Sequence, residues 1–291
     1  MRKKPTPLIA VTVLLALIGS VYADWIELAP IPDNVPPPYA GAALTYGGSH
    51  QFYAIVGGGS DQFLRYDIVS NCWSPIIPNT APPSFSDGAA LTADTADGVI
   101  YALQGGGSRE FWSYSIPGNS WSRLVDVPQP VRSGGALAFA ERSGEKFVYA
   151  TIGGGNPLFY QYARFGPGSL GSGVKPRGNT YNWYRLHELY FIDEQGHYVQ
   201  LWASPGACLS WSHGSASGFT PLDTIFCVPC DPHYGSAHFQ KQVIAYSYAD
   251  NDWHNSKPLD VTPGSGTAMA AANNESSLTL ATVLLGSRTQ Q

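Results

Sequence analysis

The sequence predicts an all-β protein of the β-propeller class, and two observations lead to this fold. Aromatic and glycine landmarks recur every 48 positions in the first half of the chain, and internal periods of this size are typical of propellers and solenoids. The chain also has 32 glycines and 23 prolines among its 291 residues, which indicates many short elements joined by turns rather than a helix bundle. The apolar content of 44% excludes an intrinsically disordered chain.

Residues 1–23 have the features of an export signal. A basic start precedes an uncharged apolar run at 8–18, and the segment ends in Val-Tyr-Ala, with small residues where a signal peptidase cleaves. An uncleaved membrane anchor is the alternative, but the apolar run is short for a span of about 20 residues. We therefore expect cleavage after Ala23, a propeller over 24–291, and a secreted, periplasmic or cell-surface protein.

The repeat is defined by landmarks that stay in phase over three copies. Tryptophans 25, 73 and 121 are spaced by 48 residues. The same step separates Tyr53, Tyr101 and Tyr149, then Tyr66, Tyr114 and Tyr162, and the glycine triplets 57–59, 105–107 and 153–155. Four landmarks in phase indicate one structural unit per period.

Each unit predicts four antiparallel strands, which is the content of one propeller blade. The predicted strands are 51–56 and 99–104 before the triplets, 63–68 and 111–116 after them, the runs that open at Trp73 and Trp121, and the Gly-Ala strands 41–46, 88–93 and 135–140. Glycine suits the turn at each triplet because tight turns often need a positive φ. We take the strand before each triplet as the innermost strand of its blade.

The second half of the chain departs from this pattern. No tryptophan follows the third copy at the expected distance, and a stretch rich in Gly, Ser, Asn and Tyr leads to a strand pair expected at 188–202. We interpret 163–203 as an insertion within one blade. A degenerate unit follows, in which Phe226 takes the place of the first tyrosine, and Tyr246 and Trp253 keep the seven-residue step.

The inner strands expected near residues 53, 101, 149, 226 and 282 predict a five-bladed propeller. The segments 25–28 and 41–46 are expected to add outer strands to the last blade. Such a closure would join the two ends of the chain and hide the sheet edges. The alternative is a chain that ends short of a six- or seven-bladed ring.

The repeat resembles that of the kelch family. The resemblance lies in IYALQGGGSREFWSYSIPGNSWSRL at 100–124 and in its two sister copies. The kelch pattern has a glycine doublet after a strand, then a tyrosine, then a tryptophan about seven residues later, and Tyr114 and Trp121 have this spacing. The resemblance implies a propeller of the galactose-oxidase-like superfamily, but it implies no single activity because propellers host many functions.

The candidate ligand-binding residues lie in two sets of loops that we expect to open on one face. The set after the glycine triplets holds Ser60, Asp61, Ser108, Arg109, Glu110 and Asn156, and the set before the Gly-Ala strands holds Tyr39, Ser86, Asp87, Arg132 and Ser133. An arginine fork suits a carboxylate or an acidic loop, and an exposed tyrosine suits stacking on a sugar or a side chain. The alternative for each residue is a solvated loop position without a ligand.

These candidates predict an exported module that binds a glycan or a protein segment. We expect a monomer with no cofactor and no membrane span after cleavage, and the net charge of −5 argues against a nucleic-acid partner. The kelch resemblance implies two enzyme alternatives. One is a sialic-acid mutarotase, for which Glu110 or Asp61 would supply acid–base groups, and the other is a copper radical oxidase, although no motif here gathers its two His and two Tyr ligands. A structural cell-envelope protein is the third alternative.

The four cysteines are the remaining chemical candidates: Cys72, Cys208, Cys227 and Cys230. Cys227 and Cys230 form a C-x-x-C motif with His233 nearby, and thiolates and imidazole are zinc ligands. Disulfides are the alternative that an exported protein favours, and redox activity is a third. Because no second C-x-x-C stands at zinc-finger spacing, we predict no metal site.

Overall fold

The computed structural model describes residues 28–142, 144–164, 181–186 and 188, together with eight later strands that extend to residue 284. The export signal predicted for 1–23 lies outside the described residues. The secondary structure of the described chain is β throughout, as predicted. Within these ranges no helix is long and apolar enough to cross a membrane.

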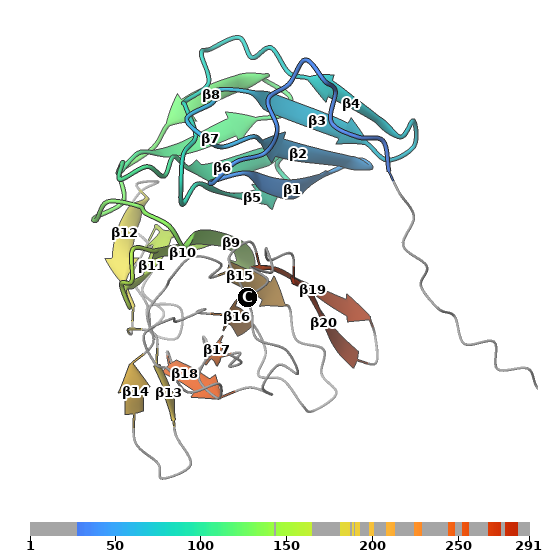
Figure 1. Cartoon of the computed structure of the whole chain (residues 1–291). Coiled ribbons are helices and arrows are strands. Elements are labelled where there is room, and N and C mark those ends of the chain that lie inside the picture. The colour runs from blue at the N-terminus through green and yellow to red at the C-terminus, as the bar shows by residue number, and fades with distance from the viewer. Residues whose placement is uncertain are drawn as a thin grey trace, which may run out of the picture.

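Four antiparallel sheets of four strands follow one another along the described chain, and each keeps its strands in sequence order (Figure 1). The first contains β1 (Ala43–Gly48), β2 (Gln51–Ile55), β3 (Phe63–Asp67) and β4 (Cys72–Pro75). The second contains β5 (Ala90–Asp94), β6 (Val99–Leu103), β7 (Phe111–Ser115) and β8 (Ser120–Arg123). The third contains β9 (Gly135–Arg142), β10 (Glu145–Ile152), β11 (Phe159–Ala163) and β12 (Asn182–Arg185), and the fourth contains β15 (Cys208–Ser212), β16 (Thr224–Val228), β17 (Ile244–Ser247) and β18 (Asp252–Asn255). These sheets have the form of propeller blades.

Two hairpins complete the described strands. The first pairs β13 (Tyr190–Ile192) with β14 (Tyr198–Gln200), which confirms the strand pair expected at 188–202, and β13 contacts β18. The second pairs β19 (Thr267–Asn274) with β20 (Ser277–Leu284), and β19 contacts β15.

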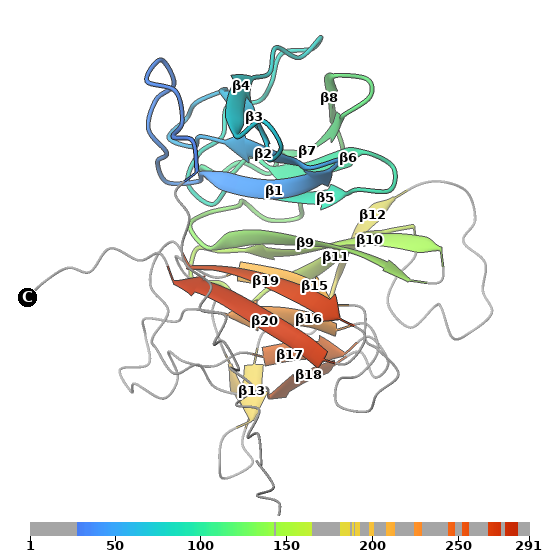
Figure 2. The same cartoon turned by 90° about the vertical axis from the view of Figure 1, so that its right-hand side faces the viewer.

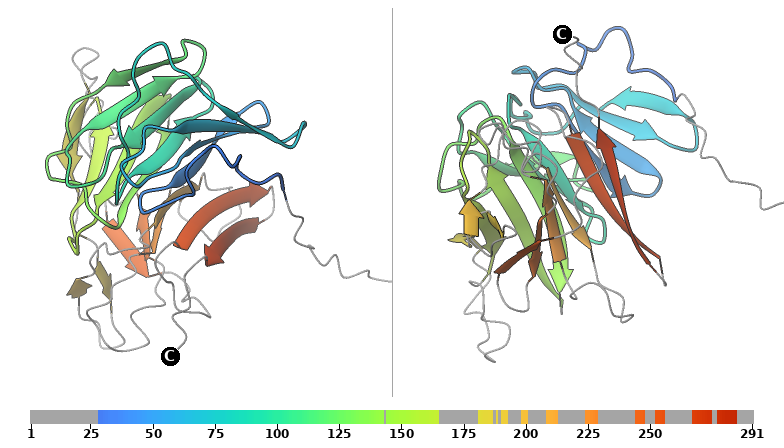
Figure 3. Two further views of the ribbon diagram at one scale, coloured as in Figure 1. Left: turned by 45° about the horizontal axis from the view of Figure 1, so that its top comes forward. Right: turned by 60° about the horizontal axis from the view of Figure 1, so that its bottom comes forward.

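The innermost strands form a row in which β1 lies against β5, β5 against β9, β9 against β15, and β15 against β19 (Figures 2 and 3). These are the Gly-Ala strands, so the prediction that the strand before each triplet is innermost is wrong. Both kinds of strand are apolar, but the Gly-Ala strands carry small residues such as Ala89 and Ala90, which are 7% exposed. Small side chains let neighbouring blades approach closely where the sheets converge.

The first innermost strand, β1, belongs to the first sheet. Thr45 of β1 pairs with Tyr53 of β2 across an antiparallel ladder. The prediction that 41–46 joins the last blade as an outer strand is therefore wrong, because a short hairpin to β2 satisfies the backbone of β1 locally. The other segment assigned to that closure, 25–28, lies outside the described residues except for Leu28.

A tyrosine–tryptophan pair recurs in the third sheet, where the sequence shows no seven-residue step. Tyr162 of β11 lies opposite Trp183 of β12, with the ring centroids 5.2 Å apart and the planes at 45°. The pair of Tyr114 and Trp121 has nearly the same geometry, at 5.1 Å and 46°. Strand β12 therefore completes the third blade, and it interrupts the insertion predicted for 163–203.

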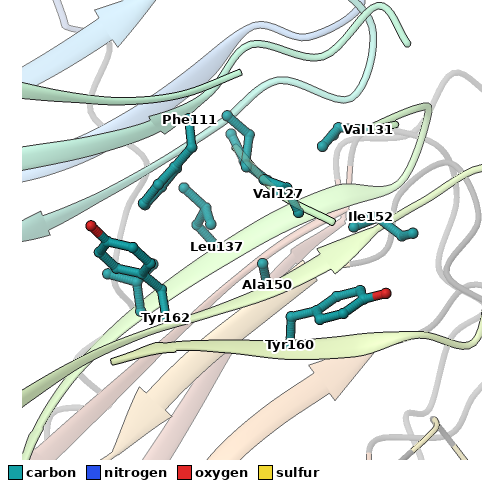
Figure 4. Packing of buried hydrophobic residues seen from close by; sticks show 11 residues of the cluster. Phe111, Val127, Val131, Leu137, Ala150, Ile152, Tyr160 and Tyr162 are labelled. Atoms are coloured by element: carbon teal, nitrogen blue, oxygen red, sulfur yellow. The ribbon is translucent and has the colours of Figure 1, made fainter. Parts of the chain in front are cut away.

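Apolar clusters fill the space between neighbouring blades. Between the first two blades, Phe63 packs edge-on against Trp121 with the ring centroids 5.0 Å apart. Between the second and third blades, Phe111, Leu137 and Tyr162 belong to one cluster (Figure 4). The recurring aromatic residues are thus packing residues, and burial of their apolar surface holds the blades together.

Candidate functional site

Main-chain hydrogen bonds join each glycine triplet to the loop before the innermost strand. In the second sheet, the N–H of Gly106 donates to the carbonyl oxygen of Asp87 at 2.7 Å, and the N–H of Ser86 donates to that of Gln104 at 3.0 Å. The first and third sheets have the corresponding bonds. The two loop sets therefore lie together at the same end of the strands in each sheet. We call this end the triplet face, and it comprises residues 39–41, 57–61, 86–88, 105–110, 132–134 and 153–156.

The first glycine of each triplet is required by this close approach. Gly105 has a φ of +72°, and a Cβ atom there would lie 2.4 Å from the carbonyl oxygen of Ser86 and 2.5 Å from the nitrogen of Ala89. Gly57 and Gly153 have φ values of +74° and +65° and equally short approaches to the neighbouring backbone. Only glycine fits such a position.

The middle glycine of each triplet supports a side chain from the adjoining loop. A Cβ atom on Gly58 would lie 2.9 Å from the Cβ of Tyr39, and one on Gly106 would lie 2.9 Å from the Cβ of Ser86. A Cβ atom on Gly154 would lie 3.0 Å from the Cδ of Arg132. We call Tyr39, Ser86 and Arg132 the rim residues. They occupy equivalent positions in three blades, and Tyr39 is 61% exposed. The sequence singled out all three, and the structure brings them to one face.

The rim residues differ chemically although the backbone beneath them repeats. They present a phenol, a hydroxyl and a guanidinium, whereas the glycines, tyrosines and tryptophans of the framework recur with little change. One residue further along, Ser133 donates its hydroxyl to Oδ1 of Asp87 at 2.8 Å, which links the loops of two neighbouring blades. Functional side chains are commonly carried on loops that a rigid scaffold positions.

The three polar residues that follow the triplets have a role in the turns. Ser60 and Ser108 accept the N–H of the residue two positions on at 3.1 and 3.0 Å, and Asn156 accepts its counterpart at 2.9 Å. These are the local side-chain turns that Ser and Asn commonly form. The side-chain oxygen of each of these three residues therefore accepts a hydrogen bond within its own loop.

Replacement of Ser108 with alanine tests this turn role. We expect a loss of about 1 kcal/mol of stability, the usual net value of one hydrogen bond, and no change in ligand affinity. Urea unfolding and a binding titration measure the two quantities. A loss of affinity with unchanged stability would instead make Ser108 a ligand contact, and Ser60→Ala provides the matched variant in the neighbouring blade.

The charged candidates after the second triplet contact nearby strands and loops. Arg109 is exposed and donates its Nε–H to the carbonyl oxygen of Val127 at 2.8 Å. Glu110 accepts the indole N–H of Trp112 at 3.1 Å and forms an ion pair with Arg123 at 3.1 Å. Both oxygens of Glu110 are thus engaged by side chains of the second sheet. Asp61 lies exposed on the first blade.

The cysteine candidates are described only in part. Cys72 is exposed and carries a free thiol. The backbone of Cys227 lies in β16 opposite Leu209 of β15, while Cys230 and His233 lie outside the described residues. Among the residues that the structure describes, no group of His, Cys, Asp and Glu is arranged to hold a metal ion.

Sequence reasoning missed a charge cluster around a buried carboxylate, at the opposite end of the blades from the triplets. Asp94 at the end of β5 is 1% exposed, and its Oδ2 lies 2.5 Å from Nζ of Lys146 on β10. Lys146 also lies 2.6 Å from Asp97. Desolvation favours the neutral amine, but the hydrogen bonds to both carboxylates raise the pKa of Lys146 above its ordinary value. The available signal was a departure from the repeat, because Gly47 stands at the place of Asp94 in the first copy.

Burial controls the chemistry of the framework tyrosines. Desolvation raises the pKa of Tyr114 and of Tyr162 to about 12. Both phenols are therefore neutral at physiological pH. They act as packing groups beside Trp121 and Trp183 rather than as acid–base groups.

Comparison with solved structures identifies proteins of similar architecture. The structure of YjhT has a TM-score of 0.53 with 11% sequence identity, over 92% of this chain and 86% of that chain. The fold is β-propeller-like. An auxiliary nutrient binding protein from Bacteroides thetaiotaomicron has a TM-score of 0.50 with 6% identity over 80% of this chain. The match spans about half of that protein, 54% of its length.

Comparison by sequence gives no corresponding relative. No protein family matches the chain, and no curated protein matches it. The kelch assignment therefore stays a resemblance of the repeat. The likeness to the solved structures concerns the fold, and a propeller fold does not define an activity.

Proposed function

We propose that the protein is an exported binding module that recognises a glycan or a protein segment on the triplet face. The observation that carries this proposal is the set of three rim residues, which place different side chains on a repeated glycine backbone. A position that packs within the framework repeats its residue type from blade to blade, as the buried framework tyrosines do. The rim positions do not, so we infer that their side chains serve a ligand.

The rim residues and their neighbours suit a ligand with a flat apolar surface and an acidic group. Tyr39 is supported by Gly58 and is 61% exposed, so it offers an aromatic surface to a sugar ring or a side chain. Arg132 rests its stem on Gly154 and is exposed, so its guanidinium fits a carboxylate. Asp87 adds an exposed acceptor between these two blades.

The wider interpretation rests on the sequence and the fold. The predicted export signal at 1–23 favours an extracellular, periplasmic or cell-surface site of action. A propeller-like protein named as a nutrient binding protein is a precedent for a binding role on this architecture. We propose that the chain acts as a monomer without a cofactor or a nucleic-acid partner.

A thermal-unfolding screen of residues 24–291 tests the proposal. The panel consists of neutral sugars, acidic sugars and acidic peptides. A ligand at a hundredfold excess over its Kd stabilises the native state by about 2.7 kcal/mol, so we expect a clear rise in Tm with one class. Stabilisation by none of these classes would count against a binding module of this specificity.

Two alanine variants then assign the ligand to the triplet face. Arg132→Ala is expected to weaken binding about tenfold or more, because a hydrogen bond to a charged group contributes about 1.5–3 kcal/mol, and Tyr39→Ala is expected to weaken it less. Arg65→Ala is the matched control, since Arg65 is exposed at the middle of β3 and lies outside the triplet face. Equal affinities for wild type, Arg132→Ala and Arg65→Ala would refute the assignment.

A further inference from the structure

The first blade leaves open a face that is covered in the second and third blades. Leu44, Leu91 and Leu137 hold the same register position, because each pairs with an alanine of the following strand. Leu91 and Leu137 are 8% and 6% exposed, whereas Leu44 is 55% exposed and Tyr46 is 44% exposed. The same position is therefore covered by the preceding blade in the second and third blades, and it is exposed in the first.

The open area is limited to the two inner strands of that blade. The segment 28–38 covers the outer strands: Trp73 donates its indole N–H to the carbonyl oxygen of Ala29 at 2.9 Å, and Val35 packs with the fully buried Leu64. What remains exposed is Ala42, Leu44 and Tyr46, with the half-buried Phe52 beside Tyr46, and we call these four residues the open inner face. Tyr46 and Phe52 meet edge to face, with the ring centroids 5.3 Å apart. An occupant two strands wide is enough to cover this area.

The hairpin β19–β20 has the matching width and position. It stands at one end of the row of innermost strands and β1 stands at the other (Figure 1). Each earlier step of the row is a face-to-face contact between neighbouring innermost strands. We propose that β19–β20 packs against the open inner face and closes the ring, with the segment 28–38 in place of the two outer strands. In this closure the hairpin and the first blade pack face to face, and no strand of one joins the sheet of the other.

The repeat specifies which residues meet in this contact. Between the second and third blades, the N–H of Phe139 on β9 donates to Oγ1 of Thr92 on β5 at 2.9 Å. Tyr46 is the register counterpart of Phe139. Gly-Thr-Ala-Met-Ala at 266–270 aligns with Gly-Ala-Ala-Leu-Thr at 88–92, so Ala270 is the counterpart of Thr92. The closure therefore places a small residue of β19 beside Tyr46.

Disulfide trapping tests the closure in the full chain. Tyr46→Cys is combined with Ala270→Cys in a Cys72→Ser background, and Thr92→Cys with Phe139→Cys is the matched control in a contact that the structure shows. Dilute protein is oxidised with copper phenanthroline, and the bridges are mapped by mass spectrometry. We expect an intramolecular bridge in both pairs, with rates within about tenfold of each other. A bridge in the control pair alone would overturn the proposal.

Two further results keep the test decisive. A bridge between the same two cysteines of different molecules would assign the open inner face to a second copy and would also overturn the proposal. The single variant Leu44→Asp needs no oxidation. The closure predicts that this variant lowers Tm by several degrees, whereas a face in contact with water predicts an unchanged Tm. Neither result depends on whether the triplet face binds a ligand.

Discussion

Gly105→Ala is expected to lower the free energy of unfolding by more than about 4 kcal/mol, a loss that few single substitutions cause. We expect this loss to abolish the soluble fold. The added Cβ would lie 2.4 Å from the carbonyl oxygen of Ser86, so main chain must move against main chain. The positive φ of +72° adds further strain. The yield of soluble protein and urea unfolding measure the effect.

The control lies in the same triplet. Gly107 has a φ of +80°, and a Cβ there would meet nothing within 4 Å. Gly107→Ala therefore bears only the backbone strain, about 1–2 kcal/mol. If the two variants were equally stable, the contact between the triplet and the neighbouring loop would not explain the glycine at 105.

Lys146→Met is the second substitution with a large expected effect, about 3–5 kcal/mol, because it leaves a buried carboxylate without its charged partner. The side chain of Asp94 is only 2% exposed and that of Lys146 is 21% exposed. Arg123→Met is the matched control. Its side chain is 49% exposed in its pairs with Glu110 and Asp126, so its loss is expected to stay below about 1 kcal/mol. Losses of similar size for both variants would contradict the structural role of the buried cluster.

The same cluster has a predicted pH dependence. The folded pKa of Lys146 is raised, so its contribution is complete below the unfolded pKa of about 10.4 and is lost as the pH rises through the folded value. The stability difference between wild type and Lys146→Met should therefore be constant near neutral pH and narrow above about pH 10.5. Urea midpoints measured for both proteins at several pH values give this stability difference. The titration of the buried tyrosines is common to both proteins, so it cancels when one midpoint is subtracted from the other.

The fold was predictable where the repeat is regular. The 48-residue step located the strands of the first two blades to within about two residues, because the glycine triplets and the Tyr–Trp pairs fix both strand ends and register. The order of strands from the centre outward was not predictable in this way. Hydrophobic pattern marks the Gly-Ala strand and the strand before the triplet alike, and only the packing of small residues distinguishes them.

Two features lay beyond the repeat. Trp183 keeps the framework geometry with Tyr162, but it stands 21 residues away from it rather than seven, so a fixed-period search passes over it. The contact of Asp94 with Lys146 joins two blades across 52 residues, and nothing in the local sequence of either residue indicates the other. Long-range pairs of this kind become visible only when the blades are placed side by side.

The candidate site was predictable as a face but not as a set of roles. Tyr39 and Arg132 were identified from their loops, and the structure places both over glycines at equivalent positions. Ser108 and Glu110 came from the same loops, yet the structure engages them in a turn and in an ion pair. Polar residues after a glycine turn serve ligands or the turn itself, and the distinction depends on hydrogen bonds that the sequence does not display.

The support of each rim side chain by a bare glycine has a consequence for how specificity could change. Each middle glycine has no side chain of its own, so the space above it accepts side chains of very different size, as Tyr39, Ser86 and Arg132 show. A library that varies positions 39, 86 and 132 together should retain the fold in most of its members. The propeller would then serve as an interchangeable scaffold whose recognition is rewritten blade by blade, while the buried aromatic pairs beneath stay constant.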